Sequence, residues 1–285
     1  MIEVRTATSP APGRPVNEDA VFQIGDLVGV LDGVTLPPGF DSGCRHGTAW
    51  YVRQLVAALC EHYTAGPTEP LATLLRSAIR TVRELHPECD LDQPSTPAAT
   101  VCLVRTGPAA VDYLVLCDTT LVIEVDGVVT AITDGRFREI IAELRRVPPD
   151  PTAGEAVGSN RGYTAGKWKR TNQPGGYWIA AATPEAADEA VTGQVPVGAS
   201  RIALLTDGAA GAVDSLSIMT WRALLDVLTD QGADALVRRI RIAEAAHAET
   251  GEFTGKVHDD ATTALLLFPT WAYRGNAAAG PHTPG

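Results

Sequence analysis

The chain has 285 residues, of which 45% are hydrophobic and 20% charged, values that are ordinary for a globular protein with a sizeable core. Asp and Glu number 34 against 23 Lys and Arg, which gives a net charge of −11. Such a charge repels nucleic-acid phosphates, and no run reaches the roughly 18 apolar residues that cross a bilayer. We therefore expect no nucleic-acid partner and no membrane span.

The five cysteines include no CxxC pair, which favours reduced thiols in a cytoplasmic protein. Residues 1–19 have neither the basic nor the apolar region of a signal peptide, so a cytoplasmic location is expected. His46 lies two residues after Cys44 but has no partner ligands at zinc-site spacing. We interpret it as a helix-start or packing residue.

The first half of the chain predicts a hairpin, two helices and four strands, in that order. Apolar residues at three- and four-residue spacing indicate the helices, and Asp126-Gly127 is typical of a two-residue hairpin turn between the last two strands. The hairpin is expected at 20–24 and 27–31, the helices at 44–63 and 71–85, and the strands at 100–105, 111–116, 121–125 and 128–132.

Residues 148–176 show no periodicity, and loops of that length are usually functional or disordered. The elements expected after this loop are strands at 177–181 and 201–205, helices at 218–228 and 233–248, and a strand at 262–268. Strands in runs and helices in pairs argue against a doubly wound parallel sheet. We predict an α+β fold, a four-layer α-β-β-α sandwich of two mostly antiparallel sheets flanked by helix pairs. Residues 1–271 would form one domain and 272–285 a disordered tail.

Acidic residues stand at the ends of several of these strands. A strand end gives a short carboxylate little freedom, which suits a preorganised cation site, and hard oxygen donors prefer Mg²⁺ or Mn²⁺ whereas zinc prefers Cys and His. Taken singly, an Asp-Gly pair is a turn signal, and Asp126-Gly127 and Asp134-Gly135 keep that interpretation. The strand-end acids are Glu18, Asp19, Asp32, Asp118, Asp207, Asp259 and Asp260.

In order and content these motifs resemble the metal-dependent protein phosphatase family, of the protein phosphatase 2C type, as a divergent, bacterial-like member. They run from residue 14 to residue 262 in the order of the family. The matched segments are Arg14-Pro15-Val16-Asn17-Glu18-Asp19, Asp32-Gly33, Cys117-Asp118-Thr119, Thr206-Asp207-Gly208 and Asp259-Asp260-Ala261-Thr262.

The resemblance implies that a water between two Mg²⁺ or Mn²⁺ ions hydrolyses phosphoserine or phosphothreonine in a protein substrate, with a third ion in some members. It implies that Arg14 clamps the substrate phosphate. Asp32 would bridge the two ions, with the carbonyl of Gly33 beside it. The other implied ligands are Glu18 and Asp19 for one ion, Asp207 and Asp259 or Asp260 for the other, and Asp118 for the third.

The chain departs from the family pattern at three places. Val34-Thr35-Leu36 follows the first Asp-Gly, with no His there, Cys117 replaces a Gly, and Asp260 replaces an Asn. Two alternatives therefore stay open, a non-catalytic binding or regulatory module of this fold and a phosphatase of a small phosphorylated metabolite.

Lys167, Lys169 and Arg170 form a basic stretch inside the long loop. We interpret them as a solvated face, with steering of an acidic phosphosubstrate as the alternative.

Overall fold

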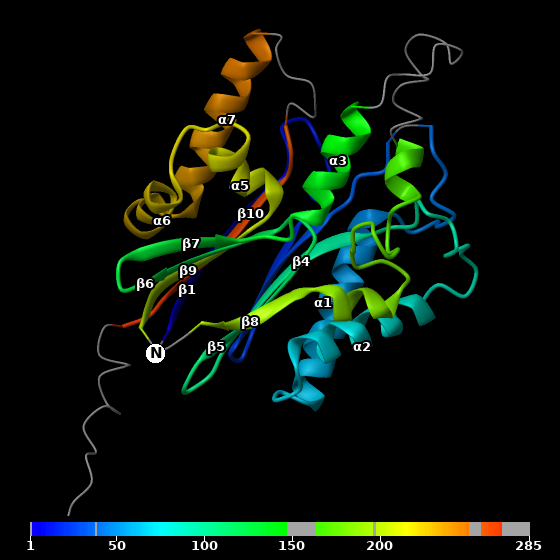
Figure 1. Cartoon of the computed structure of the whole chain (residues 1–285), viewed down its shortest axis with the longest axis horizontal. Coiled ribbons are helices and arrows are strands. Elements are labelled where there is room, and N and C mark those ends of the chain that lie inside the picture. The colour runs from blue at the N-terminus through cyan, green and yellow to red at the C-terminus, as the bar shows by residue number, and fades with distance from the viewer. Residues whose placement is uncertain (1, 38, 147–163, 196–197, 251–257, 270–285) are drawn as a thin grey trace, which may run out of the picture.

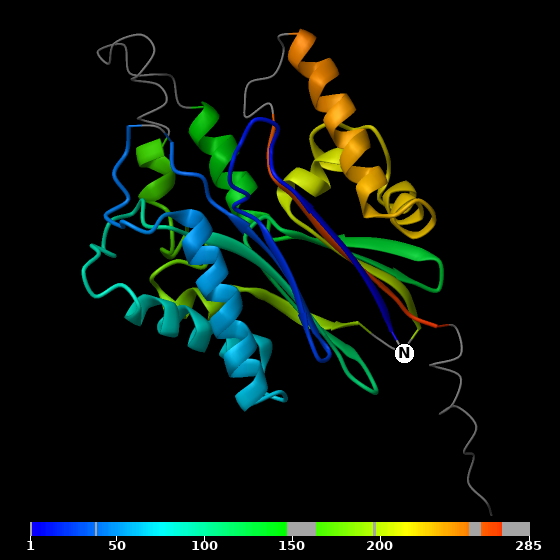
Figure 2. The same ribbon diagram turned by 180° about the vertical axis from the view of Figure 1, so that it is seen from behind.

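The computed structural model describes residues 2–37, 39–146, 164–195, 198–250 and 258–269. Two five-stranded antiparallel sheets pack face to face, and helices cover both outer faces (Figures 1 and 2). The predicted α+β sandwich is thereby confirmed. The segment 147–163 and the tail expected at 272–285 lie outside the described residues.

The first sheet has the order β1 (Glu3–Ser9), β10 (Ala261–Leu267), β9 (Ala199–Leu205), β6 (Thr120–Val125) and β7 (Val128–Ile132). The second has the order β2 (Ala20–Ile24), β3 (Leu27–Gly33), β4 (Ala99–Thr106), β5 (Val111–Leu116) and β8 (Val191–Val195).

Helices α1 (Thr48–Ala65) and α2 (Leu71–Glu84) cover the second sheet, whereas α5 (Asp207–Asp214), α6 (Trp221–Asp230) and α7 (Ala233–Thr250) cover the first. Helix α3 (Arg136–Arg146), green in Figure 1, stands at one end of the sandwich, and η1 (Pro184–Glu189) is a 3₁₀ helix next to α2. No helix in the described part of the chain has both the length and the apolar character needed to cross a membrane.

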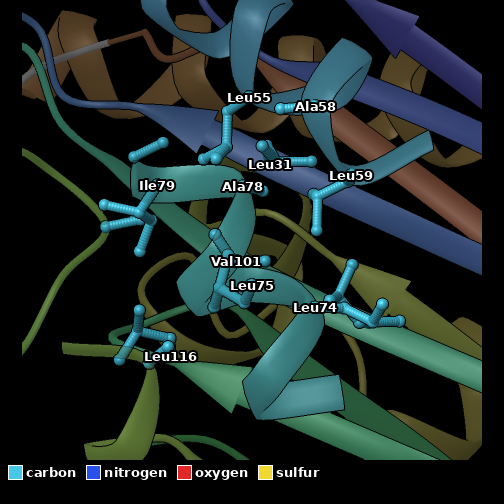
Figure 3. Packing of buried hydrophobic residues seen from close by; sticks show 14 of the residues in the cluster. Leu31, Leu55, Ala58, Leu59, Leu74, Leu75, Ala78, Ile79, Val101 and Leu116 are labelled. Carbon is cyan, nitrogen blue, oxygen red and sulfur yellow. The ribbon is translucent and has the colours of Figure 1, made fainter. Parts of the chain in front are cut away.

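The inner strands β3, β4, β6, β9 and β10 are buried on both faces, which explains their continuous apolar runs. On β3, Leu27 and Leu31 pack against α1 and α2, whereas Val28 and Val30 face the other sheet. Figure 3 shows the helix-facing layer, in which Leu55 of α1 and Leu75 and Ile79 of α2 lie over the sheet.

Several elements differ from those the sequence predicts. The edge strands β1 and β8 were not expected, because polar residues interrupt their apolar pattern. Helix α5 was also not expected, since its small residues show no helical stripe, and it adds a third helix to the pair over the first sheet. The strand expected at 177–181 makes only two isolated bridges, Ala99 to Ala180 and Thr171 to Tyr177.

A partly buried ion-pair network joins the first sheet to α6. Glu124 of β6 accepts hydrogen bonds from Arg201 Nε (2.6 Å), Ser200 Oγ (2.8 Å) and Arg222 Nη1 (2.9 Å). Chiefly because of the hydrogen bond from Arg201, the pKa of Glu124 falls to about 2. The folded state therefore holds this carboxylate charged at a pH where the unfolded chain binds a proton.

Because the folded pKa of Glu124 is depressed, its contribution to stability is complete above its ordinary value of 4.5 and disappears as the pH falls toward about 2. Glu124→Gln should lower the free energy of unfolding at neutral pH by roughly 2 kcal/mol and flatten its decline in that acid range. Urea denaturation at a series of pH values measures both effects. Glu61→Gln, at an exposed position of α1, is the matched control, and equal curves for the two variants would contradict this account.

Candidate active site

Four carboxylates from segments far apart in the sequence meet in one cavity of about 310 Å³. They are Asp32 near the end of β3, Asp118 between β5 and β6, Asp207 after β9 and Asp259 before β10. The strand ends of both sheets meet here, so the acid side chains are held by rigid backbone rather than by long loops.

Asp32 lies at the centre of this cluster. It is in hydrogen-bond contact with Asp207, and its pKa is raised well above the ordinary value, first by burial and then by the negative charges of Asp207 and its other acidic neighbours. Gly33 follows at a position where a Cβ would lie 2.5 Å from the Glu18 carbonyl oxygen and 2.6 Å from Thr48 Cγ2. A side chain at this position would collide with the Glu18 backbone, so only glycine fits there.

Asp118 is the second buried acid that faces the cavity. Burial raises its pKa, Asp259 adds to that rise, and the charge of Lys167 opposes it. Cys117, the residue before it, has φ of +66°, a left-handed conformation that a glycine would adopt without strain. The turn that presents Asp118 therefore carries backbone strain.

Asp19 lies behind the cavity wall rather than in it. Its Oδ2 accepts a hydrogen bond from Thr206 Oγ1 (2.9 Å), directly before Asp207. Burial is the main reason that its pKa rises to about 8, and hydrogen bonds from Thr262 and Thr206 limit that rise. Asp207 adds its own repulsion, so acids from both sheets act on one another's charge.

Asp259 and Asp260 are adjacent but have different surroundings. Asp260 uses both carboxylate oxygens for backbone N–H groups, Oδ1 for Ala11 and Oδ2 for Glu18, each at 2.7 Å. It therefore anchors the segment that carries Arg14 and Glu18. Asp259 lines the cavity instead, and its carbonyl accepts a hydrogen bond from Arg241 Nη1 (2.7 Å).

Arg14 and Glu18 lie beside the cavity. Arg14 Nη1 donates to Glu18 Oε2 (3.1 Å) and Thr35 Oγ1 (2.9 Å), and Thr35 Oγ1 in turn donates to Glu18 Oε2 (2.6 Å). Thr35 is part of the cavity lining. No motif in the sequence marks Thr35 as the link between Arg14 and the cavity.

Another part of the cavity wall contains two residues, Trp168 and Phe137, that the sequence does not assign to the site, together with Lys167. A short helix at 164–168 contributes Lys167 and Trp168, and α3 contributes Phe137. Lys167 Nζ lies 5.5 Å from the centre of the Phe137 ring. Lys167 is thus in the cavity wall, whereas Lys169 is exposed as expected of a solvated face.

The residues present fit small hard cations. Buried carboxylates crowded together are unfavourable unless positive charge compensates them. Carboxylate and carbonyl oxygens are the donors that Mg²⁺ and Mn²⁺ prefer.

The structure is a sandwich of two antiparallel sheets, and acids gather where strands of both sheets end. The sequence motifs predicted this arrangement. The family model for protein phosphatase 2C matches residues 15–250. The chain belongs to this family. No curated protein sequence matches the chain.

Solved structures show the same fold at low sequence identity. The PPM Ser-Thr phosphatase MsPP from Mycobacterium smegmatis, in complex with cacodylate, is 19% identical, with a TM-score of 0.56 and coverage of 94% of this chain and 98% of that one. The catalytic domain of the serine/threonine phosphatase PstP with two manganese ions is 17% identical, with a TM-score of 0.54 and coverage of 93% and 97%. Stp1 from Staphylococcus aureus is 14% identical, with a TM-score of 0.56 and coverage of 94% and 96%.

Charge crowding predicts that Asp32→Asn stabilises the protein when divalent cations are removed. The substitution removes one buried negative charge, and an amide at that position can donate a hydrogen bond to Asp207. The melting temperature of the metal-free variant at a pH of about 8 should rise by several degrees over that of the wild type, whereas added Mn²⁺ should raise it less in the variant. Differential scanning calorimetry with and without Mn²⁺ measures both changes.

The matched control is Asp92→Asn, at an exposed position, which should leave the stability within about 0.5 kcal/mol of the wild type. A metal-free Asp32→Asn protein that melts below the wild type would contradict the account of the cluster.

Proposed function

We propose that this protein is a phosphatase, dependent on Mg²⁺ or Mn²⁺, that hydrolyses phosphoserine or phosphothreonine in protein substrates. The observation that supports this most directly is the convergence of Asp32, Asp118, Asp207 and Asp259 on one cavity. Membership of the protein phosphatase 2C family gives the reaction class, and the related PstP domain carries two manganese ions.

Each acid has a role in this proposal. Asp32, with the carbonyl of Gly33, would contact both ions. Glu18 and Asp19 would hold one ion directly or through water, Asp207 and Asp259 the other, and Asp118 a weaker third. Asp260 acts through the backbone N–H groups it binds, so we assign it to positioning rather than to direct ligation. When bound, the ions would lower the pKa of a shared water and neutralise charge on the phosphoryl group.

The chain's own cations would bind the substrate oxygens. The Arg14 guanidinium is held at the cavity rim by Glu18 and Thr35 and keeps further N–H groups for a phosphate. Lys167 brings an ammonium group to the cavity wall, where its charge acts on Asp118. A phosphate monoester would lie between the two, with the acids below it.

Apolar side chains beside the acids favour a peptide over a hydroxyl-rich metabolite. Leu36, Pro37 and Trp168 line the cavity next to the charged groups, and Phe40 packs edge-on against Trp168 with ring centres 4.8 Å apart. Such walls can bury the side chains that flank a phosphorylated residue, whereas the hydroxyls of a sugar phosphate would lose hydrogen bonds to water there.

Turnover of p-nitrophenyl phosphate and of a phosphothreonine peptide tests the proposal. Both should be hydrolysed with Mn²⁺ and not with EDTA, and Asp32→Ala and Asp207→Ala should each lower kcat roughly 100-fold or more. Asp92→Ala, outside the cavity, is the control. A folded protein that turns over neither ester in excess Mn²⁺ would be a binding module, and faster hydrolysis of sugar phosphates would indicate a metabolite phosphatase.

Lys167 and Lys169 provide a matched pair for substrate binding. Lys167→Ala should raise KM for the phosphopeptide several-fold, because it removes a positive charge from the cavity, and should tighten Mn²⁺ binding, because that charge repels the ion. Lys169→Ala should change neither value. Steady-state kinetics and calorimetric Mn²⁺ titration measure the two effects, and equal behaviour of the variants would refute a substrate role for Lys167.

A further inference from the structure

A second group of candidate metal ligands lies outside the acidic cavity. Cys44 and His46 come just before α1, and Cys89 follows α2, yet one donor atom from each lies within 4.8 Å of the other two. All three side chains are half-buried, and the two cysteines are free thiols. His46 and Cys89 are 43 residues apart in the sequence, so two separate loops bring these soft donors together.

The distances between these donors match a tetrahedral zinc ion. His46 Nδ1 lies 3.6 Å from the sulfur of Cys44 and 3.6 Å from the sulfur of Cys89. A ring nitrogen carries either one hydrogen or one lone pair, which lies in the ring plane. It therefore cannot form equally good hydrogen bonds with two sulfurs. A zinc ion about 2.3 Å from sulfur and about 2.05 Å from nitrogen, at tetrahedral angles, separates the two atoms by about 3.6 Å.

The surroundings prepare the three donors for a cation. The backbone N–H of His46 donates to Cys44 Sγ (3.3 Å), an interaction that stabilises a thiolate. The His46 ring stacks on Trp50, with ring centres 4.2 Å apart and planes at 19°, which fixes the direction of its nitrogen.

His86 adds an independent observation. Only 5% of this residue is exposed, and its Nδ1 donates to the carbonyl of Val82 (2.9 Å), which leaves the lone pair on Nε2. That Nε2 is buried and has no hydrogen-bond partner among the described residues. The ring centre lies 5.1 Å from that of His46, close to the separation of about 5 Å for two imidazoles on one tetrahedral ion.

We propose that Cys44, His46 and Cys89 bind a structural zinc ion and that His86 supplies the fourth ligand. The chain thus carries Cys-x-His before α1 and His-x-x-Cys after α2. His86 Nε2 lies outside the group of three converged atoms, so its ring turns toward them when the ion binds. The soft sulfur and nitrogen donors separate this site from the hard oxygen cavity.

The ion would join the two loops that form one wall of the cavity. They already meet through Asp90 N–H to the Gly43 carbonyl (2.9 Å), Ser95 Oγ to the Asp41 carbonyl (2.6 Å) and the ion pair of Arg45 with Glu88 (2.6 Å). Thr35 to Pro37 on the first loop and Pro94 to Thr96 on the second line the cavity. The proposed zinc therefore holds the cavity wall in place without touching substrate.

Metal analysis of the full chain purified without chelators tests the proposal. The wild type should contain about one zinc per chain, as should the Asp32→Ala and Asp207→Ala variants, because their substitutions lie in the other site. Cys44→Ser and Cys89→Ser should lose the zinc, whereas Cys60→Ser, at a half-buried thiol on α1 outside the proposed site, should keep it. His86→Gln should bind zinc at least about tenfold more weakly.

Cobalt substitution of the wild type gives a readout that needs no variant. Thiolate-to-cobalt charge-transfer absorption, together with the intense visible bands of a tetrahedral ion, is the expected result. Wild type without zinc, cobalt spectra without thiolate bands, or a Cys44–Cys89 disulfide in the purified protein would each overturn the site. Normal zinc retention by His86→Gln would overturn the assignment of the fourth ligand.

Discussion

Electrostatic repulsion among carboxylates crowded around one cavity is the constraint that the rest of the site must accommodate. Asp207 and Asp19 both raise the pKa of Asp32, Asp207 also raises the pKa of Asp19, and the burial of Asp32 and Asp19 adds to the cost of charge on those two groups. A fold gains nothing in stability from such a group by itself. The proposed cations would compensate this repulsion when bound, so the arrangement would exchange stability of the metal-free protein for affinity toward cations.

The sandwich supplies the rigidity that keeps these acids together. The inner strands of both sheets are buried on two faces, and their ends cannot move apart without opening the apolar layers between sheets and helices. Polar anchors complete the frame. Thr206 holds Asp19, and Asp260 holds the backbone of the segment that carries Arg14. Residues near the acids thus fix geometry without facing the cavity.

The sequence predicts those features that depend on neighbouring residues. The buried strands, the two helices over the second sheet and the acids at strand ends follow from apolar runs, spacing and short motifs, and the fold confirms the sandwich. Edge strands β1 and β8 carry polar residues, and α5 is built of small residues, so their patterns are weak. The site roles of the individual acids stay predictions, although Asp32, Asp118, Asp207 and Asp259 share the cavity.

Features that depend on tertiary proximity could not be read from the chain. His46 shows no zinc-site spacing, because Cys89 reaches it only when α1 and α2 pack side by side. Lys167 and Lys169 have similar neighbours in the sequence. Only the fold shows that Lys167 lies in the cavity wall and Lys169 at an exposed position. The two adjacent acids Asp259 and Asp260 differ only in which backbone groups the folded chain brings to them.

The most direct test of the central claim is a crystal soaked with Mn²⁺ and measured at the manganese absorption edge. This account predicts two anomalous peaks inside the cavity, on either side of the Asp32 carboxylate, with Asp207 and Asp259 next to one of them. A cavity without anomalous density in fully soaked crystals, with its carboxylates protonated and hydrogen-bonded to one another, would contradict it.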